Sequence, residues 1–479
     1  MANRICISVG AETNEKVISE IKKCSNADII ELRLDYIKNP NLKSLLKAKK
    51  PLIITNRKKS EGGFFPGSEK ERLKLLKEAV KLGADYVDIE LSSGKKAIGD
   101  LIKIKGKTKL IVSWHNFKET PDAGKLSRIY SDIKKLNPDL VKIVTYANNI
   151  TDNFRVFKLI KKAKRERTEI ISFCMGEKGE ISRVLTTIYG GFLTFAALSK
   201  EKATAPGQLS IDELDSYNFK HLDSKTKVLG LLGNPVKHSR MPAIFNSAFR
   251  KNRMNYVYLR FPAEDVGQFV RNFRKDDNFY GFGITIPHKE EVMKYLDYVD
   301  LTAKKIGAVN TAVKRKGILI GYNTDYVGAM KALEEKTEIK NRKVVIIGAG
   351  GAAKAVAYGI KSRGGNLTIL NRTVSKAEEI AKSLKCRFGG LDELRNIDYD
   401  ILINCTSVGL KEGEMPVDTA LLKNVVMDAV YSKTDKDGKT KLLKEAEKRG
   451  CVAVSGLKML IYQAEEQSRI WTGKRILLG

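Results

Sequence analysis

The chain has 479 residues, of which 42% are hydrophobic and 30% charged, the balance of a globular protein in water and not of a disordered chain. Its net charge of +31 is spread over the whole length on apparent polar helix faces, which predicts a solvated surface that attracts carboxylates and phosphates, without nucleic-acid binding. No apolar run approaches the roughly 18 residues of a membrane span, so no membrane partner is expected.

The first half alternates short β-branched runs with lysine-rich amphipathic stretches, a pattern typical of parallel strands joined by helices. The first run follows MANR directly, without the apolar core or cleavage site of a signal peptide, so we expect a cytoplasmic protein. Eight such units predict a TIM (β/α)8 barrel over residues 1–218. The expected strands are 5–9, 28–34, 52–57, 85–91, 110–115, 140–145, 169–175 and 192–197.

The polar segment 216–227 separates this barrel from a second α/β region. That region contains one glycine-rich turn, VVIIGAGGAAKAVAYGI, which follows a β-like run and opens an alanine-rich stretch. We therefore expect a substrate domain over 226–327, completed by a C-terminal helix over 457–479, and a Rossmann nucleotide-binding domain over 328–456. The six cysteines form no CxxC pair, which predicts neither disulfides nor a metal site.

The catalytic groups of a TIM barrel lie at the carboxyl ends of its strands, so polar residues at those ends are the candidates. Glu31 and Arg33 are two apart on one expected strand and should face the same side. Lys142 stands inside the apolar run LVKIVT, where lost hydration would favour the neutral amine and allow Schiff-base chemistry. The structural alternative is a lysine that reaches the rim and pairs with a carboxylate. The remaining candidates at strand ends are Arg57, His115 and Arg183.

At these residues the first half resembles the type I 3-dehydroquinate dehydratases. The motifs that match in order and spacing are ELRLD (31–35), TNRKKSEGG (55–63), SWHNF (113–117), VKIVT (141–145), SFCMGEKGEISR (172–183) and ATAPGQL (203–209). The resemblance implies that Lys142 forms an imine with the C3 ketone of 3-dehydroquinate. It makes His115 the general base at C2 and then the acid for the departing C1 hydroxyl, with Glu61 in support. The implied substrate-binding residues are Glu31, Arg33, Arg57, Glu61, Arg183, Thr204 and Gln208.

The first half departs from this family pattern in two places. Thr204 stands where a serine is usual before Ala-Pro-Gly-Gln, and since the hydroxyl is kept, little loss is expected. Two extra residues near Glu201 and Lys202 would alter the closing loop.

The glycine-rich turn of the second half reads GxGxxA at Gly348, Gly350 and Ala353, in the strand, turn and helix context of a dinucleotide site. Small residues there let the backbone and the helix N-terminus approach a pyrophosphate. The candidate residues of the turn are Gly348, Ala349, Gly350, Gly351 and Ala352.

The cofactor is predicted to be NADP, not NAD. The expected strand 367–373 ends with Arg372, where an NAD enzyme carries an acidic residue on the ribose, and an arginine there accommodates a 2′-phosphate. The structural alternative for Arg372 is a solvent-facing loop charge. The candidate residues of this region are Asn371, Arg372, Thr373 and Lys376.

The second half as a whole resembles the shikimate dehydrogenases. The matching motifs are GNPVKHSRMP (233–242), GFGITIPHKE (281–290), IGAVNTAV (306–313), GYNTDYVG (321–328), NCTSVGL (404–410), DAVYSK (428–433) and SGLKMLIYQA (455–464). The resemblance makes Lys289 and Asp325 the catalytic pair, with Lys289 donating a proton to the C3 oxygen as NADPH delivers hydride. Without the resemblance, either would be read as an ordinary surface charge. It also implies substrate binding by Ser239, Thr285, Asn310, Tyr431 and Gln463, and contacts to the nicotinamide end by Thr406, Ser407 and Met459.

Two departures concern the substrate pocket of this half. Met241 stands where a second carboxylate-binding serine is expected, and Gly283 stands where an asparagine is usual. Both remove polar groups from the expected pocket. They leave the reaction type intact but open the choice between shikimate and a relative such as quinate.

The leading interpretation is a bifunctional shikimate-pathway enzyme. It would dehydrate 3-dehydroquinate to 3-dehydroshikimate and reduce that product to shikimate with NADPH. One alternative is a second half that acts on quinate or is a weakened dehydrogenase. Another is a basic binding protein with vestigial sites, against which the intact Lys142, His115, Lys289 and Asp325 argue. The sequence leaves the assembly state open, with a homodimer as one alternative.

Overall fold

The computed structural model describes residues 3–432 and 434–478. The chain divides into two compact units, one formed by Met1–Gly230 with Pro235–Asn278 and the other by Leu231–Asn234 with Phe279–Gly479. Three sheets organise the described residues, one of eight strands and two of six. Within the described residues, no helix is both long and apolar enough to cross a bilayer.

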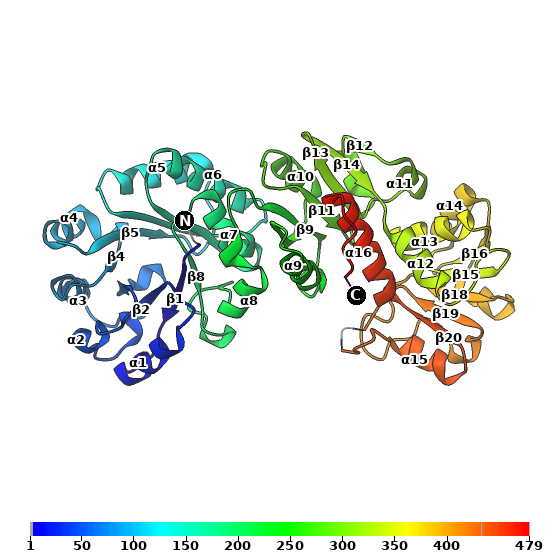
Figure 1. Cartoon of the computed structure of the whole chain (residues 1–479), viewed down its shortest axis with the longest axis horizontal. Helices are drawn as coiled ribbons and strands as arrows, with labels where there is room; N and C mark the ends of the chain where they lie inside the picture. The colour runs from blue at the N-terminus through cyan, green and yellow to red at the C-terminus, as the bar shows by residue number, and fades with distance from the viewer. Residues whose placement is uncertain (1–2, 433, 479) are drawn as a thin grey trace. The chain divides into compact units, whose positions relative to one another are not determined.

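The first sheet is the expected barrel, with every strand pair parallel and the order β7-β6-β5-β4-β3-β2-β1-β8. Each of the eight expected strands is present, although the third ends at Thr55 and leaves Arg57 in the loop that follows. Figure 1 shows the helices α1 to α6 lying outside these strands. The strands are β1 (Ile5–Val9), β2 (Ile29–Arg33), β3 (Leu52–Thr55), β4 (Tyr86–Glu90), β5 (Lys109–His115), β6 (Leu140–Tyr146), β7 (Ile170–Met175) and β8 (Thr194–Ala196).

The helices of the barrel are amphipathic because their apolar residues recur at helical spacing and pack on the sheet. The third helix illustrates the pattern: Ser68 and Glu71 form a reciprocal capping box at its start, and Leu76, Ala79 and Val80 are buried. The helices are α1 (Asn14–Lys23), α2 (Leu42–Leu45), α3 (Glu69–Lys81), α4 (Gly94–Ile104), α5 (Ala123–Lys134), α6 (Asp152–Arg165), α7 (Glu180–Leu185) and α8 (Ile211–Ser216).

The second sheet is mixed, in the order β10-β9-β11-β13-β14-β12. Strand β13 pairs antiparallel with both of its neighbours, whereas β9 with β11 and β12 with β14 are parallel. The elements of this region are β9 (Lys227–Gly233), α9 (Met241–Lys251), β10 (Tyr256–Pro262), α10 (Val266–Arg274), β11 (Gly281–Ile284), β12 (Tyr298–Val299), α11 (Leu301–Ile306), β13 (Thr311–Arg315) and β14 (Ile318–Tyr322).

The third sheet is parallel in the order β17-β16-β15-β18-β19-β20, which is the doubly wound Rossmann order 3-2-1-4-5-6. Its strand order reverses between β15 and β18, and ligands of such sheets bind outside that switch point. Valine and isoleucine of the central strands form its core with α12, α13 and α16. The elements are α12 (Asp325–Glu334), β15 (Lys343–Ile347), α13 (Gly351–Ser362), β16 (Asn366–Leu370), α14 (Val374–Leu384), β17 (Arg387–Gly389), β18 (Ile401–Asn404), β19 (Val425–Asp428), α15 (Lys441–Lys448), β20 (Val452–Ser455) and α16 (Gly456–Thr472).

Candidate active sites

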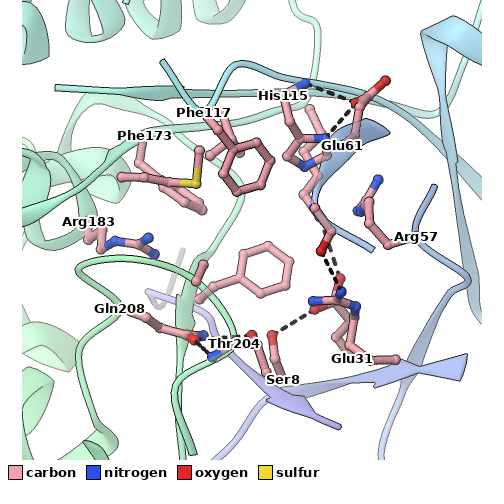
Figure 2. A pocket seen from close by; sticks show the side chains of 17 residues that line it. Ser8, Glu31, Arg57, Glu61, His115, Phe117, Phe173, Arg183, Thr204 and Gln208 are labelled. Atoms are coloured by element: carbon pink, nitrogen blue, oxygen red, sulfur yellow. Dashed lines mark hydrogen bonds and ion pairs between the residues drawn. The ribbon is translucent and has the colours of Figure 1, made fainter. Parts of the chain in front are cut away.

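A pocket opens at the carboxyl ends of the barrel strands. All nine residues that the sequence proposes for the dehydratase line it, together with aromatic and small side chains that the sequence did not single out. In Figure 2, His115 and Glu61 lie on one side of the pocket and Arg183 on the other. The lining residues are Ser8, Glu31, Arg33, Arg57, Glu61, Gly62, His115, Phe117, Lys142, Val144, Phe173, Met175, Arg183, Phe195, Thr204, Ala205 and Gln208.

Lys142 lies in the middle of β6 and is only 4% exposed. Its Nζ is 2.8 Å from Asp88 Oδ2, 3.5 Å from Glu31 Oε1 and 4.5 Å from the ring centroid of Phe195. The lysine therefore has the carboxylate partners of the structural alternative, but it stays inside the pocket and does not reach the rim. The apolar neighbours along its own strand therefore give an incomplete picture, because carboxylates from other strands also surround the amine.

Glu31 is the second carboxylate at Lys142, and two hydroxyl groups hold it in place. Ser8 Oγ donates to its Oε2 at 2.7 Å and Thr55 Oγ1 donates to its Oε1 at 2.9 Å. Burial alone would raise the pKa of Glu31, but Lys142, Arg33 and Arg57 outweigh it and lower the pKa. The residue is therefore an anion at neutral pH.

His115 ends β5 and pairs with a carboxylate. Its Nδ1 is 2.9 Å from Glu61 Oε2, which also accepts from the backbone N–H of His115 at 3.1 Å. Burial and the cations Arg57 and Lys142 lower the pKa of His115 well below its usual range, so the imidazole is neutral near pH 7. With Nδ1 directed at Glu61, Nε2 is the nitrogen left to accept a proton.

Arg57 sits in a buried network of carboxylates. Its guanidinium donates to both oxygens of Asp88, at 3.1 and 2.9 Å, and to Glu90 Oε1 at 2.9 Å. Ser113 Oγ accepts from Arg57 at 2.8 Å and donates to Asp88 Oδ1 at 2.6 Å. Sequence reasoning missed Asp88 and Glu90, although their two-residue spacing on one strand is the same signal that identified Glu31.

Arg183 lines the pocket from a different element than expected. The expectation that it stands at a strand end is wrong, because β7 ends at Met175 and Arg183 belongs to α7. Its guanidinium lies 4.6 Å from the ring centroid of Phe173 and donates to the carbonyl of Pro206 at 3.2 Å. Its buried Nε has no hydrogen-bond partner in the described part of the chain, and burial lowers its pKa to about 10.

The loop after β8 brings Thr204 and Gln208 to the pocket. The backbone N–H of Thr204 donates to Gln208 Oε1 at 2.7 Å, and its hydroxyl donates to the same oxygen at 3.1 Å. The Thr204 hydroxyl therefore bonds within the loop, where it fixes the side-chain amide of Gln208 that faces the pocket (Figure 2).

The second unit contains a polar cluster around the proposed catalytic pair. Lys289 Nζ lies 2.5 Å from Asp325 Oδ2, where Asp325 begins α12. Asn310 Nδ2 donates to Asp325 Oδ1 at 2.7 Å, and Gln463 Oε1 accepts from Thr324 Oγ1 at 3.2 Å. The loop after β11, the start of α12 and helix α16 thus bring Lys289, Asp325 and Gln463 together.

The remaining residues proposed for this substrate lie on loops and helix starts. Thr285 and Tyr431 are half-buried, and the backbone N–H of Thr285 donates to the carbonyl of Leu232 at 2.9 Å. Ser239 Oγ accepts from the backbone N–H of Met241 at 3.2 Å. Met241 begins α9 and is 3% exposed.

The glycine-rich turn lies at the switch point of the Rossmann sheet. Gly348 has φ +110°, and a Cβ there would approach the Cys405 carbonyl oxygen to 3.0 Å, so only glycine fits. Gly350 is the N-cap of α13. A Cβ on Gly351 would lie 3.3 Å from Lys289 Cδ, so the turn also faces the Lys289–Asp325 pair. Ala349 lies in the turn, and Ala352 is the second residue of α13.

The other residues proposed for the cofactor surround the same edge of the sheet. Thr406 and Ser407 follow β18, and Thr406 Oγ1 donates to Asn404 Oδ1 at 2.7 Å. Met459 is buried on α16. After β16, the side chains of Arg372, Thr373 and Lys376 are exposed, and Asn371 Nδ2 donates to the Thr373 carbonyl at 2.9 Å.

Family models match both halves of the chain. Residues 5–223 match the type I 3-dehydroquinase model, and residues 231–312 match the shikimate dehydrogenase substrate-binding domain. Residues 330–411 match the shikimate/quinate 5-dehydrogenase model, and 456–477 match the shikimate 5′-dehydrogenase C-terminal domain.

Known proteins resemble the whole chain as well as its second half. The chloroplastic bifunctional 3-dehydroquinate dehydratase/shikimate dehydrogenase of Arabidopsis thaliana is 40% identical over 98% of this chain and 82% of its own length. The shikimate dehydrogenase (NADP⁺) of Methanococcus aeolicus is 44% identical over 53% of this chain and 94% of its own. The crystal structure of shikimate dehydrogenase from Aquifex aeolicus matches with a TM-score of 0.50 and 35% identity, over 53% of this chain and 96% of that one.

These matches agree with the parallel barrel of the first half and with the Rossmann sheet of the second. The chain belongs to the family of bifunctional 3-dehydroquinate dehydratase/shikimate dehydrogenases, which join a lyase barrel to an NADP-dependent oxidoreductase.

Proposed function

We propose that Lys142 is the Schiff-base nucleophile of the dehydratase and that His115 moves the protons. The observation that carries the proposal is the meeting of a buried lysine and a neutral, carboxylate-oriented histidine in one pocket. Attack of Lys142 on the C3 ketone of 3-dehydroquinate releases water and leaves a cationic imine, which acidifies the C2 hydrogen.

His115 then takes the C2 proton through Nε2 and returns it to the departing C1 hydroxyl, so that water leaves and the imine is conjugated. Hydrolysis of that imine frees 3-dehydroshikimate and Lys142. Arg183 is a suitable partner for the substrate carboxylate, because its buried Nε has a donor to offer. We assign Glu31, Arg33, Arg57, Thr204 and Gln208 to the substrate hydroxyls and to the shape of the pocket.

In the second unit, we assign proton donation to Lys289 as 3-dehydroshikimate is reduced to shikimate. NADPH, when bound at the glycine-rich turn, supplies the hydride. Asp325 holds the Lys289 ammonium in place, and Asn310 holds Asp325. Ser239, Thr285, Tyr431 and Gln463 remain the residues proposed for the carboxylate and hydroxyls of this substrate.

One assay tests both activities. Protein, 3-dehydroquinate and NADPH are mixed, and the enone absorbance of 3-dehydroshikimate is followed together with NADPH loss. Borohydride added during turnover should trap an adduct on the peptide that carries Lys142. An adduct on another peptide, with turnover intact, would overturn the assignment of the nucleophile.

Arg372 is proposed to read the 2′-phosphate of NADP. The Arg372→Ala variant should bind NADPH about ten- to a hundredfold more weakly, since a charge-assisted phosphate contact contributes roughly 1.5 to 3 kcal/mol. Binding of NADH should be unchanged. Titration of both cofactors measures the ratio, with Arg395→Ala, an exposed arginine of the same domain, as the control. Equal weakening of both cofactors would refute the assignment.

The specificity of the second site is a separate proposal, because Met241 and Gly283 replace polar residues expected there. A serine hydroxyl can donate to a carboxylate and a thioether cannot, so Met241→Ser should lower KM for shikimate with little change in kcat. The variant should also unfold at a lower temperature, because Met241 is 3% exposed. A rise in KM would instead favour quinate or another cyclic hydroxy acid, which the same assay can compare.

Several predictions from the sequence remain proposals. They are the domain boundaries 1–218, 226–327 with 457–479, and 328–456, a cytoplasmic location and the lack of nucleic-acid binding. A homodimer stays one alternative for the assembly state. The alternative of a vestigial binding protein has no support from the pocket, where Lys142 and His115 are both in place.

A further inference from the structure

Asp88 is a fully buried carboxylate that lies behind the pocket and connects three of its functional elements. It is 0% exposed and lies on β4, between β3, which Arg57 follows, and β5, which carries Ser113. Its Oδ2 is shared by Lys142 Nζ at 2.8 Å and an Arg57 nitrogen at 2.9 Å. Its Oδ1 accepts from Ser113 Oγ at 2.6 Å and from the other Arg57 nitrogen at 3.1 Å.

This environment keeps Asp88 ionised. Burial alone would raise the pKa of Asp88, but Arg57 and Lys142 outweigh it and lower the pKa far below its usual range. A carboxylate of such low basicity is a poor proton acceptor. Asp88 is therefore suited to act as a fixed negative charge, with a geometry set by the two-pronged Arg57 contact.

The charge balance of imine formation matches a fixed anion. An ammonium and a ketone give a protonated imine and one water: the C–N bond forms, the carbonyl oxygen leaves with two protons, and nitrogen keeps its positive charge. The cation beside Asp88 is thus present before and after the step. A permanent counter-ion there stabilises both states and needs no proton transfer of its own.

We propose that Asp88 is a positioning residue that aims the Lys142 amine into the pocket and stabilises the cationic imine that follows. The proposal rests on the proposed Schiff-base role of Lys142. Glu31 contacts the same nitrogen at 3.5 Å, a longer distance, and is itself directed by Ser8 and Thr55. Asp88 is the carboxylate with the shorter contact and the more rigid support.

The pH dependence of imine trapping gives a readout of the charge of Asp88. The charged and titratable groups that face Lys142 come from several strands and loops. They are Cys6 on β1, Glu31 on β2, Arg57 after β3, Asp88 on β4 and His115 on β5. Removing the negative charge of Asp88 destabilises the ammonium form, so the neutral amine should be available at lower pH.

The test compares the trapping of the imine by cyanoborohydride over a range of pH in the full-length protein. Asp88→Asn should lower the maximal trapping rate by roughly 10- to 100-fold, because the amine is no longer held in the reactive geometry. It should also move the midpoint of the pH profile by about one to three units toward acid, since a close opposite charge is lost. A purely structural role would reduce the rate without moving the midpoint.

Two variants separate charge from geometry. Asp88→Glu keeps the charge but displaces it, so the midpoint should stay near that of the unmodified protein while the maximal rate falls. Glu90→Gln neutralises a carboxylate that pairs with Arg57 at 2.9 Å but is not a partner of Lys142 in the described structure, so it should shift the midpoint less than Asp88→Asn.

Each outcome bears on one proposal. Absence of a Lys142 adduct in the unmodified protein contradicts the Schiff-base function itself. With that adduct present, an Asp88→Asn profile whose midpoint coincides with that of the unmodified protein overturns the role of Asp88. If thermal unfolding shows that Asp88→Asn does not fold, Asp88→Glu decides: an unchanged trapping rate is then the contradicting result.

Discussion

Replacing Lys142 with alanine should lower dehydration of 3-dehydroquinate by about three orders of magnitude or more, the usual consequence of removing a covalent nucleophile. No other lysine lines the pocket in the described structure, so no second amine can replace it. The oxidation of shikimate with NADP should persist, because Lys289 and Asp325 form their own cluster in the second unit.

The control for this result is Lys109→Ala. Lys109 is an exposed lysine at the amino end of β5, away from the pocket. Thermal unfolding should accompany the assay, because Lys142→Ala leaves Glu31 and Asp88 buried with one fewer cation. Full dehydratase activity in a folded Lys142→Ala protein would exclude imine catalysis at this residue.

Lys289→Ala should reduce the rate of the dehydrogenase by about 10²- to 10⁴-fold, the usual contribution of a positioned proton donor. The effect should appear in kcat, because the proton is transferred to the substrate oxygen only as that oxygen gains negative charge. In the coupled assay, 3-dehydroquinate would still be dehydrated. The enone signal of 3-dehydroshikimate should therefore rise and persist while NADPH is consumed slowly.

Lys294→Ala is the matched control, since Lys294 is an exposed lysine a few residues along the same segment. Asp325→Asn should also lower kcat, because the amide no longer provides the negative charge that holds the ammonium. A Lys289→Ala protein that loses only substrate affinity would show that Lys289 binds the substrate and donates no proton.

The barrel could be predicted from the sequence because its strands are buried on both faces and appear as continuous β-branched runs. Such runs need no long-range information, and every strand of β1 to β8 was identified in this way. The Rossmann sheet was equally accessible, because the glycine turn after β15 has a local backbone requirement at Gly348. The ends of elements were less accessible, as the early end of β3 before Arg57 illustrates.

The partners of Lys142 could not be predicted from its own strand. Pairing register places Ser113 beside Lys142 and Glu90 beside Ser113, and Asp88, two residues earlier on β4, reaches the lysine across the intervening strand β5. The curvature of the nearly closed sheet brings them together. The position of Arg183 on a helix was not predicted for another reason. The chain leaves β7 and turns into α7, which carries the side chain back to the pocket.

Among the described residues, the buried Nε of Arg183 has no hydrogen-bond partner, and this affects the stability of the barrel. A buried guanidinium with an unused donor destabilises the folded protein, because its hydration is lost without full replacement. A ligand carboxylate can relieve that penalty only in the folded state. Part of the binding free energy therefore comes from removing the unfavourable free energy of the unpaired guanidinium. Selection for tight carboxylate binding at this position therefore opposes selection for a more stable barrel. Substitutions of Arg183 that stabilise the folded barrel should weaken carboxylate binding in the pocket.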